Sequence, residues 1–335
     1  MTARVGINGF GRIGRGVMRA LVGRPDFEIV AINDLYAAEQ LAYLLRFDSV
    51  MGVFPEPVSA RPGELVVGGR TIRLSAAREP RLVPWRESGV EYVVESTGAF
   101  LTRAELTGHL EAGARRVVLT VPPADALDAM IVMGVNDDRL RADHRLVSNA
   151  SCTTNCLAPL VRILDDAFGL RQGLITTVHA YTNDQRLADV PHRELRRSRA
   201  AAVNLIPTTT GAARAVGRIL PHLAGRLDGR AVRVPVPDGS LVELVCRLER
   251  DADAAAINAA VRAAAEGPLR NIVEFSELPL VSSDIIGNSH SSIFDSLSTV
   301  ARGDGFARVV SWYDNEWGYS NRVVDVLTRM ASFDR

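Results

Sequence analysis

The first third of the chain alternates short apolar runs with longer stretches in which apolar residues recur every three or four positions. Such runs are typical of buried β-strands, and such stretches of amphipathic helices. Strands that alternate with helices of this length predict βαβ units and a parallel, doubly wound sheet. A hairpin with a Gly-Gly turn is expected over residues 65–74. The expected strands are residues 3–7, 27–33, 91–97 and 115–121, and the expected helices are 11–23, 37–47 and 102–113.

The pattern changes after Ala150. A helix over residues 153–168 is followed by the longer expected strands 172–182, 230–237 and 240–250. Strand-rich sequence with few helical crossovers predicts an α+β domain with a mixed or antiparallel sheet. We therefore expect an α/β protein with a first domain over residues 1–150 and a second over 151–317. An amphipathic helix within residues 318–335 is expected to pack back on the first domain.

Composition restricts the class of protein. The 335 residues are 47% apolar and 23% charged, as in ordinary globular proteins, and contain no apolar run of 18 residues that predicts a membrane span. Three cysteines, an odd number, argue against a disulfide framework and favour a cytoplasmic protein. The net charge of zero gives no support for nucleic-acid binding. All 39 basic residues are arginine, which excludes a Schiff-base lysine.

Three glycines, Gly9, Gly11 and Gly14, follow the first expected strand and open the first expected helix. Asp34 ends the next strand, 20 residues after Gly14. Glycines at this spacing make a tight turn and let the backbone approach a pyrophosphate, which binds the helix N-terminal amides. A glycine-rich turn without a ligand is the alternative. Strand, helix and acidic residue together predict a dinucleotide site in which Asp34 accepts hydrogen bonds from the adenosine ribose.

The stretch SNASCTTNCLAPL contains Cys152 and Cys156. A zinc site needs more clustered ligands, and a disulfide between residues four apart on a helix has poor geometry. A buried core thiol suits Cys156 and Cys246. Cys152 instead lies among polar residues at a helix start, where the helix amides and a histidine lower a thiol pKa. We expect Cys152 to be a reactive thiolate and expect no metal.

Among the six histidines, His179 is the best partner, because it ends an expected strand and precedes polar residues. From the residues alone it can equally be a structural histidine. A nicotinamide cofactor and an activated cysteine imply that the thiolate adds to an aldehyde, a hydride leaves and a thioester remains. The stretch IPTTTGAAR and the arginines Arg197, Arg199 and Arg233 suggest a phosphate site, although such segments are commonly solvated loops.

Nine segments, spread over almost the whole chain, resemble the sequence motifs of one family. They include RVGINGFGRIGR, ESTGAF, SNASCTTNCLAPL, HAYTNDQ, IPTTTGAA, VRVPVPDGS and SWYDNEWGYSNR. The chain is similar to the phosphorylating (type I) glyceraldehyde-3-phosphate dehydrogenases. The resemblance implies a Rossmann-type NAD-binding domain, a catalytic domain and a homotetramer. It also implies an oxidoreductase of glycolysis and gluconeogenesis, which converts glyceraldehyde 3-phosphate and inorganic phosphate reversibly to 1,3-bisphosphoglycerate.

The resemblance also assigns roles by motif position. It implies that Cys152 is the nucleophile and His179 the base that activates it, and that residues 180–202 reach the cofactor of a neighbouring subunit. Residues implied to hold the substrate phosphate and the attacking phosphate are Ser151, Thr153, Thr182, Arg197, Thr210, Gly211 and Arg233. Residues implied to contact the cofactor, besides the glycines, are Arg12, Ile13, Asp34, Arg78, Thr120 and Asn315.

Two alternatives stay open. An erythrose-4-phosphate dehydrogenase resembles this family but usually lacks the sequence motifs HAYTNDQ and IPTTTGAA. A non-catalytic nucleotide- or RNA-interacting protein on the same fold is disfavoured by the neutral charge and by the Cys152–His179 pair. For the cofactor, we predict NAD over NADP. Asp34 would repel a 2′-phosphate, and Val190-Pro191 resembles the apolar pair of NAD-specific relatives.

Overall fold

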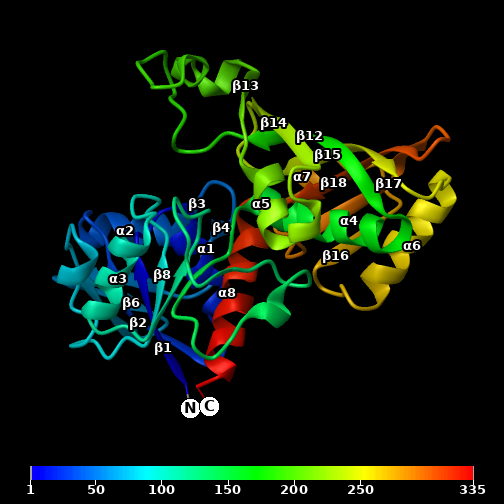
Figure 1. Ribbon diagram of the computed structural model, residues 1–335. Coiled ribbons are helices and arrows are strands. Elements are labelled where there is room, and N and C mark those ends of the chain that lie inside the picture. The colour runs from blue at the N-terminus through cyan, green and yellow to red at the C-terminus, as the bar shows by residue number, and fades with distance from the viewer. Residues whose placement is uncertain (1, 335) are drawn as a thin grey trace. The chain divides into compact units, whose positions relative to one another are not determined.

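The computed structural model describes residues 2–334 and divides into two compact units (Figure 1). The first unit comprises residues 2–131, 137–150 and 320–334. The second comprises Val132–Asn136 and Ser151–Tyr319. Within the described residues, no helix has both the length and the apolar character that crossing a membrane requires.

The first unit is built on a nine-stranded sheet with the order β10-β11-β9-β8-β1-β2-β7-β6-β5. Seven strands, from β10 to β7 in that order, are parallel, and β6 and β5 extend the sheet as an antiparallel pair. The strands are β1 (Ala3–Asn8), β2 (Phe27–Asn33), β5 (Val58–Arg61), β6 (Glu64–Val67), β7 (Arg70–Ser75), β8 (Tyr92–Glu95), β9 (Arg116–Leu119), β10 (Ala129–Met130) and β11 (Leu146–Ser148). The fold class expected from the sequence is confirmed.

The strand order reverses at β1. The chain builds β2 and β7 on one side of β1 and then β8, β9 and β11 on the other. In open α/β sheets of this kind ligands bind beyond the carboxyl ends of the strands at the reversal, here β1 and β8. The helices of this unit are α1 (Arg12–Leu21), α2 (Ala38–Arg46), α3 (Arg103–Glu111) and the short 3-10 turns Pro80–Leu82 and Asp137–Arg139. A small separate sheet pairs β3 (Phe47–Asp48) with β4 (Gly52–Val53).

The central strands β8, β9 and β11 are buried along their whole length, as expected for a parallel sheet with both faces covered. One core cluster joins Trp85 and Leu106 to strand residues such as Val93 and Val117. The predicted hairpin is also confirmed. Gly68 and Gly69 both have positive φ between β6 and β7, the conformation of a tight two-residue turn.

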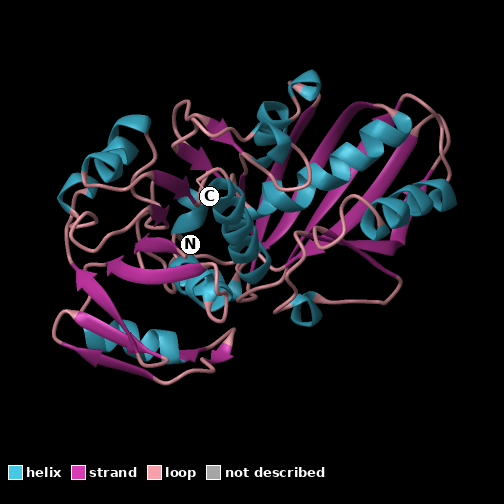
Figure 2. Ribbon diagram, turned by 90° about the horizontal axis from the view of Figure 1, so that it is seen from below, coloured by secondary structure: helices cyan, strands magenta, loops and turns pink. Residues whose placement is uncertain are grey.

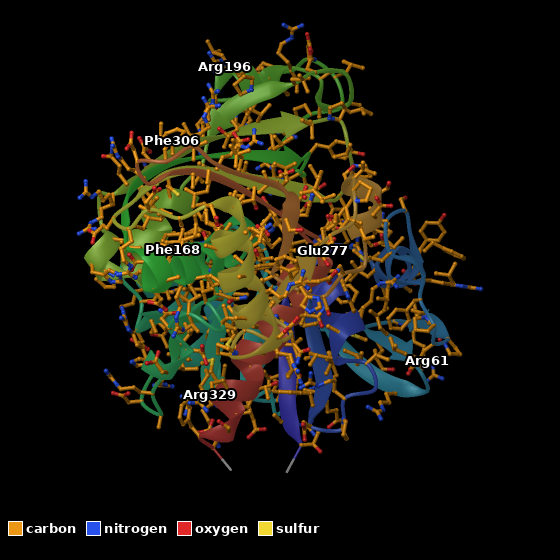
Figure 3. All side chains as sticks on the ribbon, turned by 90° about the vertical axis from the view of Figure 1, so that its right-hand side faces the viewer. Arg61, Phe168, Arg196, Glu277, Phe306 and Arg329 are labelled. Atoms are coloured by element: carbon orange, nitrogen blue, oxygen red, sulfur yellow. The ribbon has the colours of Figure 1, made fainter. Side chains whose placement is uncertain are left out.

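The C-terminal helix α8 (Trp317–Ser332) continues into the first unit from Ser320 onward. Arg329, labelled in Figure 3, lies in the last turns of this helix. Beyond it, Asp334 accepts hydrogen bonds from Arg116 Nε at 2.9 Å and Nη2 at 2.8 Å, and from the Tyr92 hydroxyl at 2.5 Å. Because Arg116 and Tyr92 belong to adjacent strands of the first unit, the C-terminal segment is fastened to that sheet.

The second unit contains a seven-stranded mixed sheet, mostly antiparallel, with the order β13-β14-β12-β15-β18-β17-β16 (Figure 2). The strands are β12 (Leu170–Ala180), β13 (Ile206–Thr209), β14 (Leu227–Val234), β15 (Ser240–Leu248), β16 (Val273–Ser276), β17 (Ser292–Ala301) and β18 (Phe306–Tyr313). The helices are α4 (Cys152–Phe168), α5 (Ala212–Ile219), α6 (Ala254–Glu266) and α7 (Ser282–Ile285). Short 3-10 turns span Leu195–Ser198, Ala201–Val203 and Pro221–Leu223.

Some strand bounds differ from the expected ones. The strand expected over 230–237 ends at Val234, because Pro235 and Pro237 have no N–H to donate to a sheet. Helix α4 agrees with its prediction, and local residues define it: the Ser151 hydroxyl caps its start and Gly169 ends it with a φ of 72°.

Candidate active site

Glycine is required at two places in the loop after β1. Gly9 has a φ of 86°, and a Cβ atom there would lie 2.7 Å from the backbone nitrogen of Thr97. A Cβ on Gly14 would lie 2.2 Å from the carbonyl oxygen of Gly9. Gly11, the residue before α1, is exposed and has open space where a side chain would stand. The start of α1 is therefore an open cradle of backbone amides, which fits a pyrophosphate.

Asp34 is partly exposed at the end of β2. Its Oδ2 accepts a hydrogen bond from the backbone N–H of Phe10 at 2.6 Å, and its Oδ1 accepts one from Tyr36 at 3.1 Å. Helix α2 starts only at Ala38, so Asp34 does not cap it. The carboxylate thus ties the glycine loop to the end of β2, the position that the dinucleotide prediction requires.

The other residues predicted to contact the cofactor have different surroundings. Arg12, in the first turn of α1, forms an ion pair with Asp48 at 2.5 Å, and Ile13 beside it is partly buried. Thr120 is buried and its hydroxyl donates to the Glu95 carbonyl at 3.0 Å. The remaining two are Arg78, which is exposed in the first unit, and Asn315, which is buried in the second unit and accepts from Ser240 Oγ at 2.6 Å.

Cys152 and His179 come together within the second unit. Cys152 is the first residue of α4 and half-buried, and its Sγ lies 3.4 Å from Nε2 of His179, near the end of β12. Ala150, two residues before Cys152, has a φ of 54°, a strained value for a residue with a Cβ. The backbone turn at Ala150 and the Ser151 cap determine where the helix begins and therefore where the thiol lies.

Burial governs the ionisation of this pair. It raises the pKa of the Cys152 thiol to about 11, although the Arg233 charge and hydrogen bonds from Thr153 act in the opposite direction. Burial, and then the Arg233 charge, lowers the pKa of His179 to about 3. In this geometry desolvation outweighs the helix amides and Arg233 and acts against the predicted low thiol pKa.

Arg233 lies against the other side of His179. Its Nη1 lies 2.6 Å from His179 Nδ1 and donates to the Ala180 carbonyl at 2.9 Å. The same carbonyl lies 2.7 Å from Nδ1. The Nε atom of Arg233 is buried without a hydrogen-bond partner among the described residues. A bound anion fits such an unsatisfied guanidinium.

Tyr313 was not singled out by sequence reasoning, although it lies in the quoted motif SWYDNEWGYSNR. Its hydroxyl pairs with Thr153 Oγ1 and Thr177 Oγ1, each at 2.9 Å. Its ring meets the His179 ring edge-on at 5.9 Å between centroids. Tyr313 thereby holds the imidazole and the start of α4 in place, and its position on β18 could not be inferred from spacing.

The predicted phosphate residues are not equally available. The Ser151 hydroxyl caps α4, and the Thr153 hydroxyl is buried against Tyr313. Thr210 Oγ1 accepts from Ala212 N at 3.2 Å, at the start of α5. Gly211 precedes α5 and has open space around it. The N-terminus of α5 is therefore open, whereas two of the predicted hydroxyls already have structural partners.

Arg197 and Thr182 both bond to Asp184, which the sequence indicated only as one of the polar residues after His179. Arg197 Nε also donates to Glu194 at 2.7 Å and to Thr208 Oγ1 at 3.0 Å. Burial opposes ionisation of Asp184, but the bonds from Thr182 and the Arg197 charge outweigh it and lower its pKa. Two residues predicted to bind phosphate are thus already paired with a carboxylate of the same loop.

The other two cysteines are buried and free. Cys156 Sγ contacts Ser292 Oγ at 3.7 Å and the Ser311 carbonyl at 3.8 Å. Burial raises the pKa of Cys156 and of Cys246 to about 12. The interpretation of both as core thiols is confirmed. Over residues 2–334, no three histidine, cysteine or carboxylate side chains gather in a way that could hold a metal ion.

A doubly wound sheet with a glycine loop, and a cysteine–histidine pair in a second unit, define a dinucleotide-dependent dehydrogenase with a thiol in its site. Residues 3–103 match the NAD binding domain of glyceraldehyde 3-phosphate dehydrogenase, and residues 151–315 match its C-terminal domain. The chain belongs to the glyceraldehyde-3-phosphate dehydrogenase family. Its nucleotide cofactor is NAD, as expected.

Curated relatives cover the chain from end to end. Glyceraldehyde-3-phosphate dehydrogenase 1 of Bacillus subtilis is 54% identical over 332 residues, 99% of both chains. The glyceraldehyde-3-phosphate dehydrogenase of Priestia megaterium is 53% identical over 333 residues, also 99% of both chains. That of Mycobacterium tuberculosis is 53% identical over 335 residues and 98% of both chains. The resemblance inferred from the motifs is confirmed.

Proposed function

We propose that this chain catalyses the reversible, NAD-dependent oxidative phosphorylation of glyceraldehyde 3-phosphate to 1,3-bisphosphoglycerate. The observation that carries the proposal is the 3.4 Å separation between Cys152 Sγ and His179 Nε2. Family membership supports the substrate, and the open glycine cradle of the first unit supports the cofactor.

His179 acts first as a base. Its Nε2 accepts the thiol proton of Cys152 when the imidazole carries its own proton on Nδ1 and donates it to the Ala180 carbonyl. This tautomer requires Arg233 Nη1, a donor 2.6 Å from Nδ1, to turn away towards the bound phosphate. The thiolate then attacks the aldehyde carbon and forms a hemithioacetal, and the imidazolium donates a hydrogen bond to the resulting oxygen. NAD, when bound, accepts the hydride that leaves this carbon. A thioester on Cys152 remains, and His179, still protonated, returns its proton to the sulfur when phosphate displaces it.

Inorganic phosphate releases the acyl group from Cys152. Its oxygen attacks the thioester carbon, the C–S bond breaks, and the acyl phosphate leaves. We propose that Arg233 binds the substrate phosphate through its unsatisfied Nε–H, and that Thr182 joins it once its hydroxyl leaves Asp184. Arg197, Thr210 and Gly211 would bind the attacking phosphate. Arg197 can do so only after its ion pair with Asp184 opens. Ser151 and Thr153 contribute mainly by fixing the start of α4.

The test is NADH formation from glyceraldehyde 3-phosphate. We expect fast turnover that depends on added phosphate, or on arsenate in its place, and that Cys152→Ala abolishes. Erythrose 4-phosphate serves as the competing substrate. A higher kcat/KM for erythrose 4-phosphate would favour the alternative dehydrogenase, and absence of NADH with either aldehyde would favour a non-catalytic nucleotide-binding protein.

We propose that the chain forms a homotetramer in which residues 180–202 contact a neighbouring copy. Apolar side chains in and just after this segment are exposed, including Leu187 at 85% and Leu195 at 82%. Contiguous exposed apolar residues are typical of interfaces. Light scattering should give about four times the chain mass of 36.3 kDa. Leu187→Asp with Leu195→Asp should reduce it, and a wild-type monomer at micromolar concentration would contradict the proposal.

We also propose NAD over NADP and a cytoplasmic location. The three thiols are free, which supports a reducing compartment. Asp34 leaves no room for a 2′-phosphate without bringing like charges together. kcat/KM should be higher for NAD, and Asp34→Gly with Pro191→Ser should narrow the difference. Equal use of both cofactors by the wild-type enzyme would contradict this preference.

A further inference from the structure

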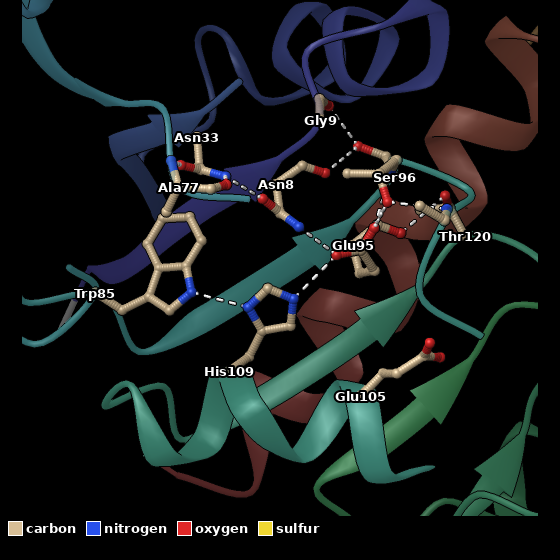
Figure 4. A network of polar contacts seen from close by, with 12 residues as sticks. Asn8, Gly9, Asn33, Ala77, Trp85, Glu95, Ser96, Glu105, His109 and Thr120 are labelled. Atoms are coloured by element: carbon tan, nitrogen blue, oxygen red, sulfur yellow. Dashed lines mark hydrogen bonds and ion pairs between the residues drawn. The ribbon is translucent and has the colours of Figure 1, made fainter. Parts of the chain in front are cut away.

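A network of buried polar side chains lies beneath the glycine loop of the first unit (Figure 4). Glu95, the last residue of β8, is at its centre with no exposed surface. His109 and Trp85 are equally buried, and Asn8 is 1% exposed. The proposed chemistry does not use this network, and of its members only Gly9 and Thr120, at its edge, are among the predicted cofactor contacts. A buried carboxylate needs a specific reason, because its desolvation is costly.

The Glu95 carboxylate accepts four hydrogen bonds. Asn8 Nδ2 donates at 2.5 Å, His109 Nε2 at 2.9 Å, and Thr97 donates from its backbone N–H at 2.8 Å and its hydroxyl at 2.5 Å. The backbone carbonyl of Glu95 accepts from both the N–H and the hydroxyl of Thr120 at 3.0 Å. One residue thus joins the segments that follow β1, β8 and β9, the strand ends at the reversal of the sheet.

Trp85 fixes the direction of the bond from His109. An indole N–H can only donate, so His109 Nδ1 accepts from Trp85 Nε1 at 2.9 Å. The proton of a neutral imidazole then lies on Nε2 and points at Glu95. In Figure 4 the indole, the imidazole and the carboxylate follow one another in this order.

Asn33 fixes the bond from Asn8 in the same way. Asn33 Oδ1 accepts from Ser75 Oγ and from Ala77 N, each at 2.8 Å, so its Nδ2 is the donor to Asn8 Oδ1 at 2.7 Å. The Nδ2 of Asn8 is therefore the end that faces Glu95. Every neighbour presents a donor, and only an acceptor-only group, a carboxylate, satisfies them all.

We propose that Glu95 is a positioning residue for the dinucleotide site: it holds the glycine loop and the segments at Thr97 and Thr120 in the binding conformation before the cofactor arrives. The inference rests on the proposed function, since it assumes that these strand ends bind NAD. Preformed loops cost less ordering free energy on binding. Ser96 Oγ adds to the same assembly by donating to the Gly9 carbonyl at 2.7 Å.

Glu95→Gln is the direct test, because it keeps the shape and places a donor against donors. We expect the Kd for NAD to rise about tenfold or more, with kcat at saturating NAD, the KM for glyceraldehyde 3-phosphate and Cys152 alkylation in NAD-free enzyme nearly unchanged. Glu105→Gln is the matched control. Glu105 is exposed on α3 and bonds only to residues at the start of that helix.

Rescue separates positioning from general damage. In Glu95→Gln with Trp85→Phe, His109 is free to move its proton to Nδ1 and accept at Nε2 from the new amide, while the amide still opposes Asn8 Nδ2. We expect this double variant to recover part of the NAD affinity lost in Glu95→Gln, although Trp85→Phe alone lowers the Tm. If Glu95→Gln does not fold, restored folding of the double variant, with a Kd above that of Trp85→Phe, supports the inference.

Three results would overturn the inference: an unchanged Kd in folded Glu95→Gln, no recovery in the double variant, or a double variant that stays unfolded. Asp34→Ala distinguishes failure of the proposed function. If Asp34→Ala leaves the Kd for NAD unchanged, the cofactor site itself is misplaced. If Asp34→Ala weakens NAD while Glu95→Gln does not, only the positioning role fails.

Discussion

Cys152 and Cys156 lie one turn apart on the same helix, yet their surroundings differ. Cys152 faces an imidazole, whereas Cys156 faces hydroxyl and carbonyl oxygens of β17 and β18 in the core. Burial raises the pKa of both thiols, so the pKa does not distinguish the two cysteines. What distinguishes Cys152 is a base within reach of its proton.

The first prediction follows from that difference. Cys152→Ala should abolish NADH formation, while Cys156→Ala should keep activity and lose stability by about 1 kcal/mol. One equivalent of iodoacetamide should label Cys152 only, as peptide mass spectrometry can show, and Cys246→Ala is the control. Near-normal turnover by Cys152→Ser would disprove the assignment.

The second prediction concerns pH. Because the pKa of Cys152 is about 11 and that of His179 about 3, the thiolate fraction of NAD-free enzyme should rise steadily from pH 6 to 10. The alkylation rate should rise with it, without a plateau near neutral pH. His179→Asn should slow acylation roughly 10²–10⁴-fold. A plateau in alkylation below pH 8 would mean that a thiolate–imidazolium pair exists before substrate binds.

Arg233 provides the third prediction. Arg233→Ala should reduce kcat/KM for glyceraldehyde 3-phosphate far more than for unphosphorylated glyceraldehyde, because a phosphate contact is lost. It should also raise the pKa of His179, since the nearby cation is removed. The acid limb of the pH dependence of kcat/KM should therefore move to higher pH for both substrates. Arg230→Ala, an exposed arginine on the same strand, is the control. Equal losses for both substrates would exclude the phosphate role.

At the scale of elements, the turn from β1 into α1 contains glycines that differ in whether the packing of the fold requires them. Gly14 is needed because the helix passes close to the Gly9 carbonyl, whereas Gly11 has free space and an ordinary φ of −72°. The fold therefore requires Gly14 but not Gly11, where we propose that the approach of the cofactor is what requires a glycine.

This separation gives the fourth prediction. Gly14→Ala should lower both the Tm and NAD affinity, because its Cβ would lie 2.2 Å from a backbone oxygen. Gly11→Ala should keep the Tm within about 2 °C, a change of under ~0.5 kcal/mol, yet weaken NAD binding about tenfold or more. Calorimetry and fluorescence titration measure the two effects. If Gly11→Ala binds NAD normally, the pyrophosphate does not approach this turn.

These elements also show what sequence can predict. The glycine spacing, Asp34 and the Gly-Gly hairpin follow from local rules, and the structure places each in its expected backbone setting. The partners of these residues do not follow. Glu95 meets His109 and Trp85, and Cys152 is held through Tyr313, across separations that only the folded sheet determines. Strands β16 to β18 were likewise not predicted, although β17 and β18 pair locally across the turn at Gly303 and Gly305; the pairing of β18 with β15 is the long-range one.

At the scale of the whole molecule, positive charge resides entirely on guanidinium groups, and several are anchors. Arg116 holds Asp334 beyond the C-terminal helix, Arg12 holds Asp48, and Arg197 holds Glu194. Planar bidentate donors suit such anchoring better than an ammonium group. One buried acidic pair has no such cation among the described residues. Asp238 and Asp314 are each 1% exposed, and Asp314 receives backbone N–H groups from Gly287, Glu316 and Trp317.

Asp238 is the member of this pair whose ionisation is disfavoured. Its Oδ1 accepts from Gly239 N at 2.8 Å and Asn315 N at 3.2 Å, while its Oδ2 is buried without a donor among the described residues. Burial, the Asp314 charge and its hydrogen bond, and the Glu316 charge raise the pKa of Asp238 to about 9. Asp238 is therefore protonated at neutral pH.

The last prediction follows by linkage. The folded pKa of Asp238 exceeds the unfolded value near 4, so its stabilising effect is complete below about pH 4 and is lost as pH rises towards 9. Asp238→Asn replaces the acid O–H with an amide N–H that does not titrate. The variant should match wild-type stability near pH 4.5 and exceed it at pH 8 by on the order of a few kcal/mol. Asp238→Ala, which loses the hydrogen bonds, should be less stable at both pH values. Urea unfolding of NAD-free enzyme across this range measures the effect, and parallel pH slopes for wild type and Asp238→Asn would show that Asp238 is ionised in the folded protein.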